Sequence, residues 1–102
     1  MEVIVNPEAR RILMKHQPEP DAALRLAAMD EGCGCGATVL YEMNWDLPRP
    51  DDIRLKAGDL TVVVDRHSLA YFDSTVFVEC RPGTHAFWLK SPNQIYLSNL
   101  VF

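Results

Sequence analysis

Hydrophobic and polar positions alternate along most of this chain, and one stretch near its start has helical spacing instead. Glu2 to Val5 alternates with β-branched residues and predicts a short strand. Asn6-Pro7-Glu8 then supplies a capping side chain, a proline for the first helical position and an acid for the first turn. Apolar residues recur at helical spacing from Ala9 to His16. The pattern therefore predicts an amphipathic helix that ends before Pro18, with His16 partly buried on its apolar face.

A period of two residues begins at Leu24. Leu24, Leu26 and Ala28 share one face of a predicted strand, and a second strand is predicted from Ala37 to Met43. The glycine- and cysteine-rich segment between them is then a connection between two strands. Prolines interrupt the alternating pattern in the next stretch of the chain, so a loop is predicted from Asn44 to Asp52. Trp45 in this loop is expected to cover the edge of the core.

The second half of the chain predicts two hairpins and a short helix. Ala57-Gly58-Asp59 separates strands at Ile53 to Lys56 and Leu60 to Asp65. A short helix capped by Asp65 or Ser68 is expected within Asp65 to Tyr71. The remaining predicted elements are a strand at Thr75 to Cys80, a turn at Arg81-Pro82-Gly83, a strand at Thr84 to Lys90 and an apolar tail at Ile95 to Phe102.

These elements predict a mainly β fold. The run Thr61-Val62-Val63-Val64 is apolar on both faces, which is typical of a central strand. About seven short strands fit a β-sandwich of two sheets packed face to face, with the N-terminal helix covering an end or edge and a short helix after the central strand. At 102 residues, the chain is expected to form one domain over 1–102.

Composition and charge exclude several classes of protein. Hydrophobic residues make up 48% and charged residues 24%, as in ordinary globular proteins. A net charge of -4 and scattered basic residues argue against nucleic-acid binding. No apolar stretch approaches the roughly 20 residues that span a bilayer, and the first residues lack the features of a secretory signal. Three cysteines do not make a disulfide framework, which favours a reducing cytoplasm.

Chemistry is concentrated in Gly32-Cys33-Gly34-Cys35-Gly36. Glycines let the backbone approach a ligand closely, and a thiolate pair suits a soft metal or an iron–sulfur cluster. The alternative interpretation is structural, because free cysteines are often small buried hydrophobes. In an extended strand the two thiols would point to opposite faces, which argues against both lying in the core, and the flanking glycines favour a loop instead.

Other candidate residues carry weaker signals. Cys80 fits a buried apolar residue as well as a ligand, and His67 and His85 are expected to cap a turn and to decorate a strand. The acidic pairs Asp30-Glu31 and Asp51-Asp52 are typical of solvated turns. No catalytic triad, phosphate-binding loop or zinc-peptidase motif is present, so we expect a protein that is not an enzyme.

Four segments together resemble the HesB/IscA-like domain, the A-type iron–sulfur family. They are Leu24-Arg25-Leu26, Gly32-Cys33, the block from Val62 to Thr75, and Phe87 to Gln94. The resemblance covers nearly the full chain and implies a compact β fold with an N-terminal helix. It also implies a role in assembling, carrying or delivering iron–sulfur clusters, with Cys33 matching the family's first cluster-binding cysteine.

The chain departs from the family pattern at its end. Carriers of this family usually finish in Cys-Gly-Cys-Gly, whereas no cysteine follows Cys80 here and a second thiol, Cys35, stands beside the first. The chain therefore resembles a divergent bacterial branch of the family.

A cluster needs about four protein ligands. The leading hypothesis is that two protomers of a homodimer each present Cys33 and Cys35 to a [2Fe–2S] cluster at their interface. Assembly or recipient proteins would then be the partners. Two alternatives remain: a non-enzymatic adaptor of the same fold without a cluster, and a thiol redox or zinc-binding module.

Overall fold

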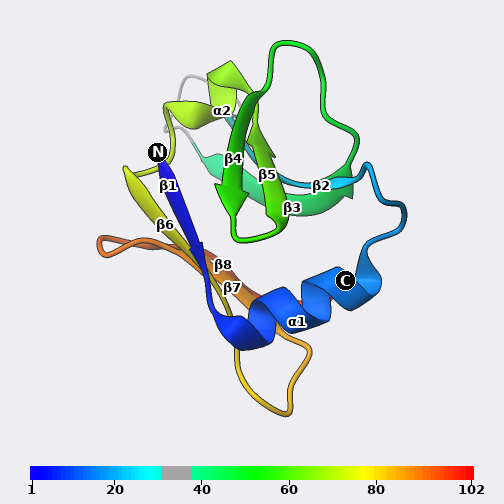
Figure 1. Cartoon of the computed structure of the whole chain (residues 1–102). Coiled ribbons are helices and arrows are strands. Elements are labelled where there is room, and N and C mark those ends of the chain that lie inside the picture. Colours follow the sequence, from blue (N-terminus) through cyan, green and yellow to red (C-terminus); the bar gives the residue numbers. More distant parts are fainter. Residues whose placement is uncertain (31–37) are drawn as a thin grey trace.

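The strands of the described residues form two four-stranded sheets (Figure 1). The structure is a computed structural model that describes residues 1–30 and 38–102. The first sheet has the order β1-β6-β7-β8 and the second the order β3-β2-β5-β4, which confirms the predicted mainly β, two-sheet fold. The first sheet comprises β1 (Glu2–Val5), β6 (Thr75–Cys80), β7 (Phe87–Lys90) and β8 (Ile95–Leu100). The second comprises β2 (Ala23–Asp30), β3 (Val39–Asp46), β4 (Ile53–Ala57) and β5 (Leu60–Val64).

Both described helices begin at the predicted capping residues. The Asn6 side chain accepts a hydrogen bond from the Ala9 N–H at 2.8 Å at the start of α1 (Pro7–His16). Asp65 caps α2 (Arg66–Leu69) by accepting from the Ser68 N–H at 3.2 Å. His16, expected to be partly buried, is exposed at the last position of α1, where the chain leaves the helix. Neither described helix has the length and apolar character that crossing a bilayer requires.

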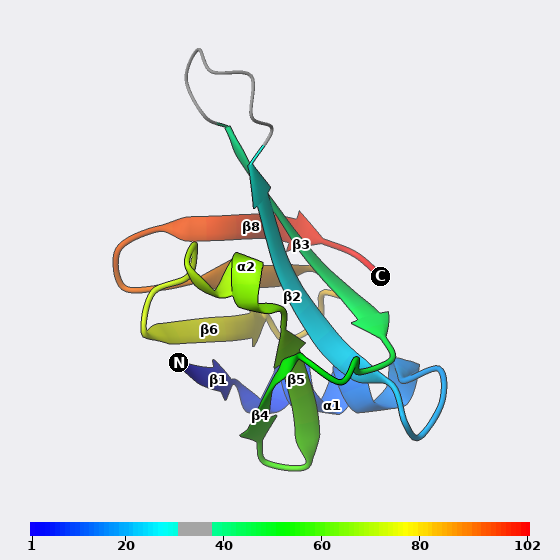
Figure 2. The same ribbon diagram turned by 90° about the horizontal axis from the view of Figure 1, so that it is seen from above.

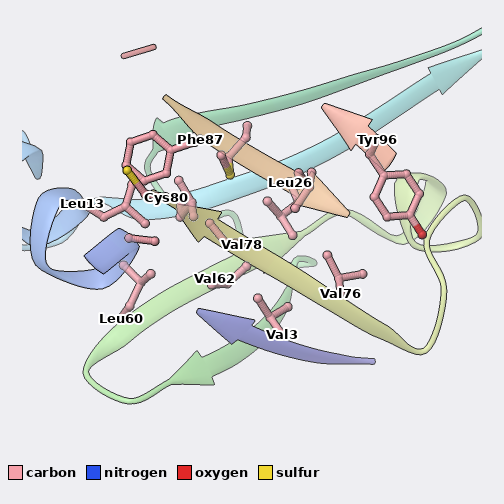
Figure 3. Packing of buried hydrophobic residues seen from close by; sticks show 14 of the residues in the cluster. Val3, Leu13, Leu26, Leu60, Val62, Val76, Val78, Cys80, Phe87 and Tyr96 are labelled. Carbon is pink, nitrogen blue, oxygen red and sulfur yellow. The ribbon is translucent and has the colours of Figure 1, made fainter. Parts of the chain in front are cut away.

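The hydrophobic core lies between the two sheets and against α1. Figure 3 shows side chains of both sheets converging, with Leu26 and Val62 from the second sheet and Val76 and Val78 from the first. Leu13 of α1 joins them and is fully buried. β5 lies between β2 and β4, and its residues Val62, Val63 and Val64 are all 0% exposed, which confirms the predicted central strand.

Two predicted loop and strand boundaries were wrong. The segment 44–46 was expected to be loop, but β3 continues to Asp46 because it stays paired with β2, Ala23 lying opposite Asp46. Trp45 is therefore a strand residue whose side chain packs against the core. The strand expected from Thr84 begins only at Phe87, after the turn in which Gly83 adopts a positive φ of 80°.

Candidate functional site

The hairpin of β2 and β3 holds both ends of the cysteine-rich segment. Its ladder runs without interruption from Ala23 opposite Asp46 to Asp30 opposite Val39. In Figure 2, the end of this hairpin that adjoins residues 31–37 in the sequence extends beyond the other strands of the two sheets. Cys33 and Cys35 lie outside the described residues, in 31–37. The described flanks agree with the prediction that the thiols belong to a connection between two strands.

The end of β2 that precedes the cysteine-rich segment in the sequence is hydrogen-bonded to α2. The Ser68 hydroxyl donates to the Ala28 carbonyl at 3.0 Å and accepts from the Ala28 N–H at 2.9 Å. Ser68 is 2% exposed, so these bonds are sheltered from water. The last residues of β2 are thus held by β3 on one side and by α2 on the other.

The opposite end of β2 carries a buried ion-pair cluster. Arg25 donates through Nη1 and Nη2 to the two carboxylate oxygens of Asp52, at 3.0 and 2.6 Å. Its Nε donates to Asp46 at 2.7 Å. The side chain of Asp52 is only 1% exposed, so its expected place in a solvated turn was wrong. The cluster ties the segment between β3 and β4 to the strand that leads to the thiols.

Charge attraction shifts the pKa values in this cluster. The hydrogen bonds from Arg25 lower the pKa of Asp52 from 3.8 to about 2, despite the opposing effect of burial. The pKa of Asp46 is also lowered, mainly by its hydrogen bond from Arg25. The pKa of Arg25 is raised, chiefly by its bonds to Asp52. All three groups are therefore charged near neutral pH.

Acid is expected to remove the stabilisation that Asp52 provides. A carboxyl whose pKa is lower in the folded than in the unfolded state stabilises the fold above its unfolded pKa and loses that contribution as pH falls through the folded value. The difference in free energy of unfolding between the wild type and Asp52→Asn should therefore narrow from about pH 5 to about pH 2. Urea denaturation of both proteins at several pH values measures this difference in free energy of unfolding. A difference that stays constant over this range would contradict the shifted pKa.

A second polar cluster joins two of the segments on which the family resemblance rests. Asp73, between α2 and β6, accepts hydrogen bonds from the hydroxyls of Ser91 and Tyr96, the latter at 3.1 Å. Ser91 in turn accepts from the backbone N–H groups of Asn93 and Gln94, each at 3.2 Å. The hydrogen bond from Ser91 is the main cause that lowers the pKa of Asp73. These hydrogen bonds thus connect the turn between β7 and β8 to the segment that leads into β6.

The other candidate ligands are dispersed. Cys80 is 1% exposed at the end of β6, where its Sγ lies 3.4 Å from the Thr84 carbonyl oxygen, so its interpretation as a buried residue fits. His67 lies exposed in α2, whereas His85 precedes β7 and does not decorate a strand. Among the described residues, no three His, Cys, Asp or Glu side chains are grouped so that they could hold a metal ion.

Exposed apolar side chains lie next to the cysteine-rich segment. Met29 and Leu40 are register partners on the hairpin, with 48% and 43% of their surface exposed. Both lie on the face of the second sheet that carries Arg25, away from the core. A hollow of about 460 Å³ adjoins this face and is lined in part by Glu42, Asn44 and His67. The flanks of the segment thus combine an apolar pair with a polar hollow.

The comparison with protein-family models identifies one family. The family model described as iron–sulphur cluster biosynthesis matches residues 1–102. The search of curated proteins finds no match.

Three crystal structures have a similar fold. A protein from Lactobacillus salivarius described as an Fe–S biosynthesis protein has a TM-score of 0.64 at 16% identity, with 99% of this chain and 94% of that chain covered. Its counterpart from Lactobacillus acidophilus gives 0.63 at 14% identity, with coverages of 97% and 85%. SufA of Escherichia coli, involved in the biosynthesis of iron–sulfur clusters, gives 0.54 at 18% identity, with coverages of 87% and 77%. At sequence identities this low, the similarity to these three structures shows a common fold and nothing further.

Proposed function

The chain belongs to the iron–sulphur cluster biosynthesis family, and from this premise we propose that it binds an iron–sulfur cluster, or the iron for one, through Cys33 and Cys35. The bound species is cargo that the protein receives during cluster assembly or passes to a recipient protein, and the protein catalyses no reaction of its own. The cysteine content favours a reducing cytoplasm as the place of this activity.

The observation that supports this proposal is the position of the two cysteines in the sequence, between β2 and β3. They stand in the segment that joins β2 to β3, and the register fixes its flanks, with Asp30 opposite Val39. The described cysteine and histidines do not form an alternative ligand set. Thiolate sulfur is a soft donor and the usual ligand of iron–sulfur clusters, so the donor chemistry of Cys33 and Cys35 fits this cargo.

Ligand number favours a dimer. A [2Fe–2S] cluster takes about four protein ligands, and this segment supplies two per chain. A two-fold axis beside the hairpin doubles that number without any further residue. Met29 and Leu40, exposed apolar residues on the same hairpin, support contact with a second copy at this end of the molecule. We therefore assign the cluster to the interface of a homodimer.

Anaerobic reconstitution with iron and sulfide tests this proposal. The product is examined by absorption spectroscopy, iron and sulfide analysis, and native mass spectrometry. The expected result is a coloured dimer whose added mass corresponds to one [2Fe–2S] cluster. A colourless protein without iron, bound zinc in its place, or a mass loss of two hydrogens from a disulfide would overturn it, and each outcome points to one of the alternatives.

A further inference from the structure

Two adjoining hollows lie where α1 meets β1 and the turn between β4 and β5. One hollow, of about 490 Å³, is lined by residues of α1 and by Asp59. The other, of about 350 Å³, is lined by residues of β1 and β4 and by Gly58. Arg10 lines both hollows, so they adjoin each other at its side chain. Figure 1 shows the end of β1, the start of α1 and the β4–β5 turn coming together at this place.

The two hollows together are termed the basic groove, because their charge is opposite to that of the whole chain. The basic side chains that line them are those of Arg10, Arg11, Lys15 and Lys56. Among the residues that the structure describes, Asp59 is the only acidic one in the lining. Even when Glu8 is counted, since it pairs with Arg11, two positive charges are in surplus. The chain as a whole has a net charge of -4, so a negatively charged partner is attracted to the groove rather than to the remaining surface.

Two arginines of the basic groove already bind carboxylates of this chain. The Arg10 Nη2 donates to the Asp59 carboxylate at 3.2 Å, and Arg11 donates to Glu8. The side chains of Arg10 and Asp59 are 46% and 72% exposed, and an ion pair this open to water contributes little to stability. A carboxylate of another molecule can therefore replace Asp59 at Arg10 with little loss to the fold.

Exposed apolar side chains accompany these charges. Met14 lines the larger hollow and is 38% exposed, and Ile4 lines the smaller one and is 41% exposed. Arginine and methionine are both enriched in protein–protein interfaces. A bilayer surface does not enter a hollow, and the net charge of -4 opposes the approach of nucleic acid or anionic lipid. The combination favours a segment of a protein as the occupant.

We propose that the basic groove binds an acidic segment of a partner protein. Its carboxylates pair with the arginines, to which they can bind in a bidentate manner, and its apolar side chains contact Met14 and Ile4. Asp59 competes with these carboxylates for Arg10 and thereby weakens the binding. The inference goes beyond the proposed function, because the groove contains neither Cys33 nor Cys35 and requires no cluster.

Fluorescence anisotropy with two labelled peptides tests the inference. One peptide alternates glutamate with serine and leucine, and the other has glutamine in place of every glutamate. The protein without cluster should bind the glutamate peptide and should not bind the glutamine peptide. Added salt should lower the affinity for the glutamate peptide, because it screens charges at an exposed surface.

Single substitutions with matched controls then locate the binding site. Arg10→Gln should weaken the affinity for the glutamate peptide by about 5-fold, the upper end for one exposed ion pair. Arg66→Gln changes the net charge equally in α2, outside the groove, and should keep the wild-type affinity. Asp59→Asn frees Arg10 and should tighten binding by up to about 5-fold, whereas Asp51→Asn should have no effect. All four positions are exposed, so each variant is expected to fold, which circular dichroism verifies.

Several results would overturn the inference. One is the absence of binding to the glutamate peptide at low salt, and another is equal binding of the glutamine peptide. Equal effects of Arg10→Gln and Arg66→Gln, or of Asp59→Asn and Asp51→Asn, would show a response to net charge alone. Binding of vesicles that contain phosphatidylglycerol in place of the peptide, weakened by Arg10→Gln, would make the groove a membrane site instead. A protein that fails to bind a cluster leaves this inference standing, because the assay uses none.

Discussion

Replacing Asp52 by alanine is expected to lower the free energy of unfolding by about 3 kcal/mol, the lower end of the cost of breaking a buried ion pair. The side chains of Arg25 and Asp52 are 10% and 1% exposed, so the substitution leaves a guanidinium in a site with little access to water. In the wild type, Asp46 also accepts a hydrogen bond from the Arg25 Nε at 2.7 Å, and Asp52→Ala leaves this partner in place. The expected loss of free energy of unfolding therefore stays at this lower end. Urea denaturation followed by tryptophan fluorescence measures it.

The neighbouring Asp51 provides the matched control. It is exposed in the same turn, whereas Asp52 is buried, so Asp51→Ala should change the free energy of unfolding by less than about 0.5 kcal/mol. The double variant Arg25→Met with Asp52→Leu removes both charges together and should cost less than Asp52→Ala alone, because no buried guanidinium is left without the Asp52 carboxylate. Similar losses in Asp51→Ala and Asp52→Ala would refute a special role for the buried pair.

Elements governed by neighbouring residues could be predicted from the sequence. Asn6 and Pro7 fixed the start of α1 because a capping side chain and a proline act on the backbone within one turn. Gly58 marked the β4–β5 hairpin because its φ of 64° suits glycine. The same local chemistry predicted Asp65 or Ser68 as the cap of α2, and the structure has Asp65 in that role. Each of these features depends on contacts a few residues apart.

Features that depend on distant residues could not be predicted in this way. Asp51 and Asp52 are identical in type, and the contact of Asp52 with Arg25 joins residues 27 positions apart. An arginine within the apolar run Leu24-Arg25-Leu26 was the available signal that an acidic partner is needed. β3 extends to Asp46 because β2 provides a strand partner over its whole length, although its last residues have loop-like neighbours in sequence.

The candidate site combines both kinds of information. The spacing of Cys33 and Cys35 is a local feature, and it led to the hypothesis of a thiolate pair between two strands. The hydrogen bonding of Ser68 to Ala28 joins residues 40 positions apart, so a serine in a short helix gave no indication of it. The structure therefore adds the contacts of the strand that precedes the cysteines in the sequence, whereas the ligands themselves remain a prediction from the sequence.

Serine at Cys33 or at Cys35 is expected to abolish cluster binding. The visible absorption after anaerobic reconstitution should fall to the level of protein without iron in each single variant, because a serine hydroxyl stays protonated and is a poor soft donor. In a symmetric dimer each substitution removes one ligand from both chains, so half of the proposed ligand set is lost at once. Iron and sulfide content should fall in parallel with the absorption.

Cys80→Ala is the control for the general loss of a thiol. Cys80 is 1% exposed within the core and its Sγ lies near the Thr84 carbonyl oxygen, so this variant should lose some stability but keep the full cluster absorption. Circular dichroism in the far ultraviolet verifies that all three variants are folded. If Cys35→Ser kept the full absorption while Cys33→Ser lost it, one thiol per chain would suffice and the four-thiolate dimer would be wrong. If Cys80→Ala lost the absorption, the third cysteine would have to approach the cluster, which its position against α1 and the core opposes.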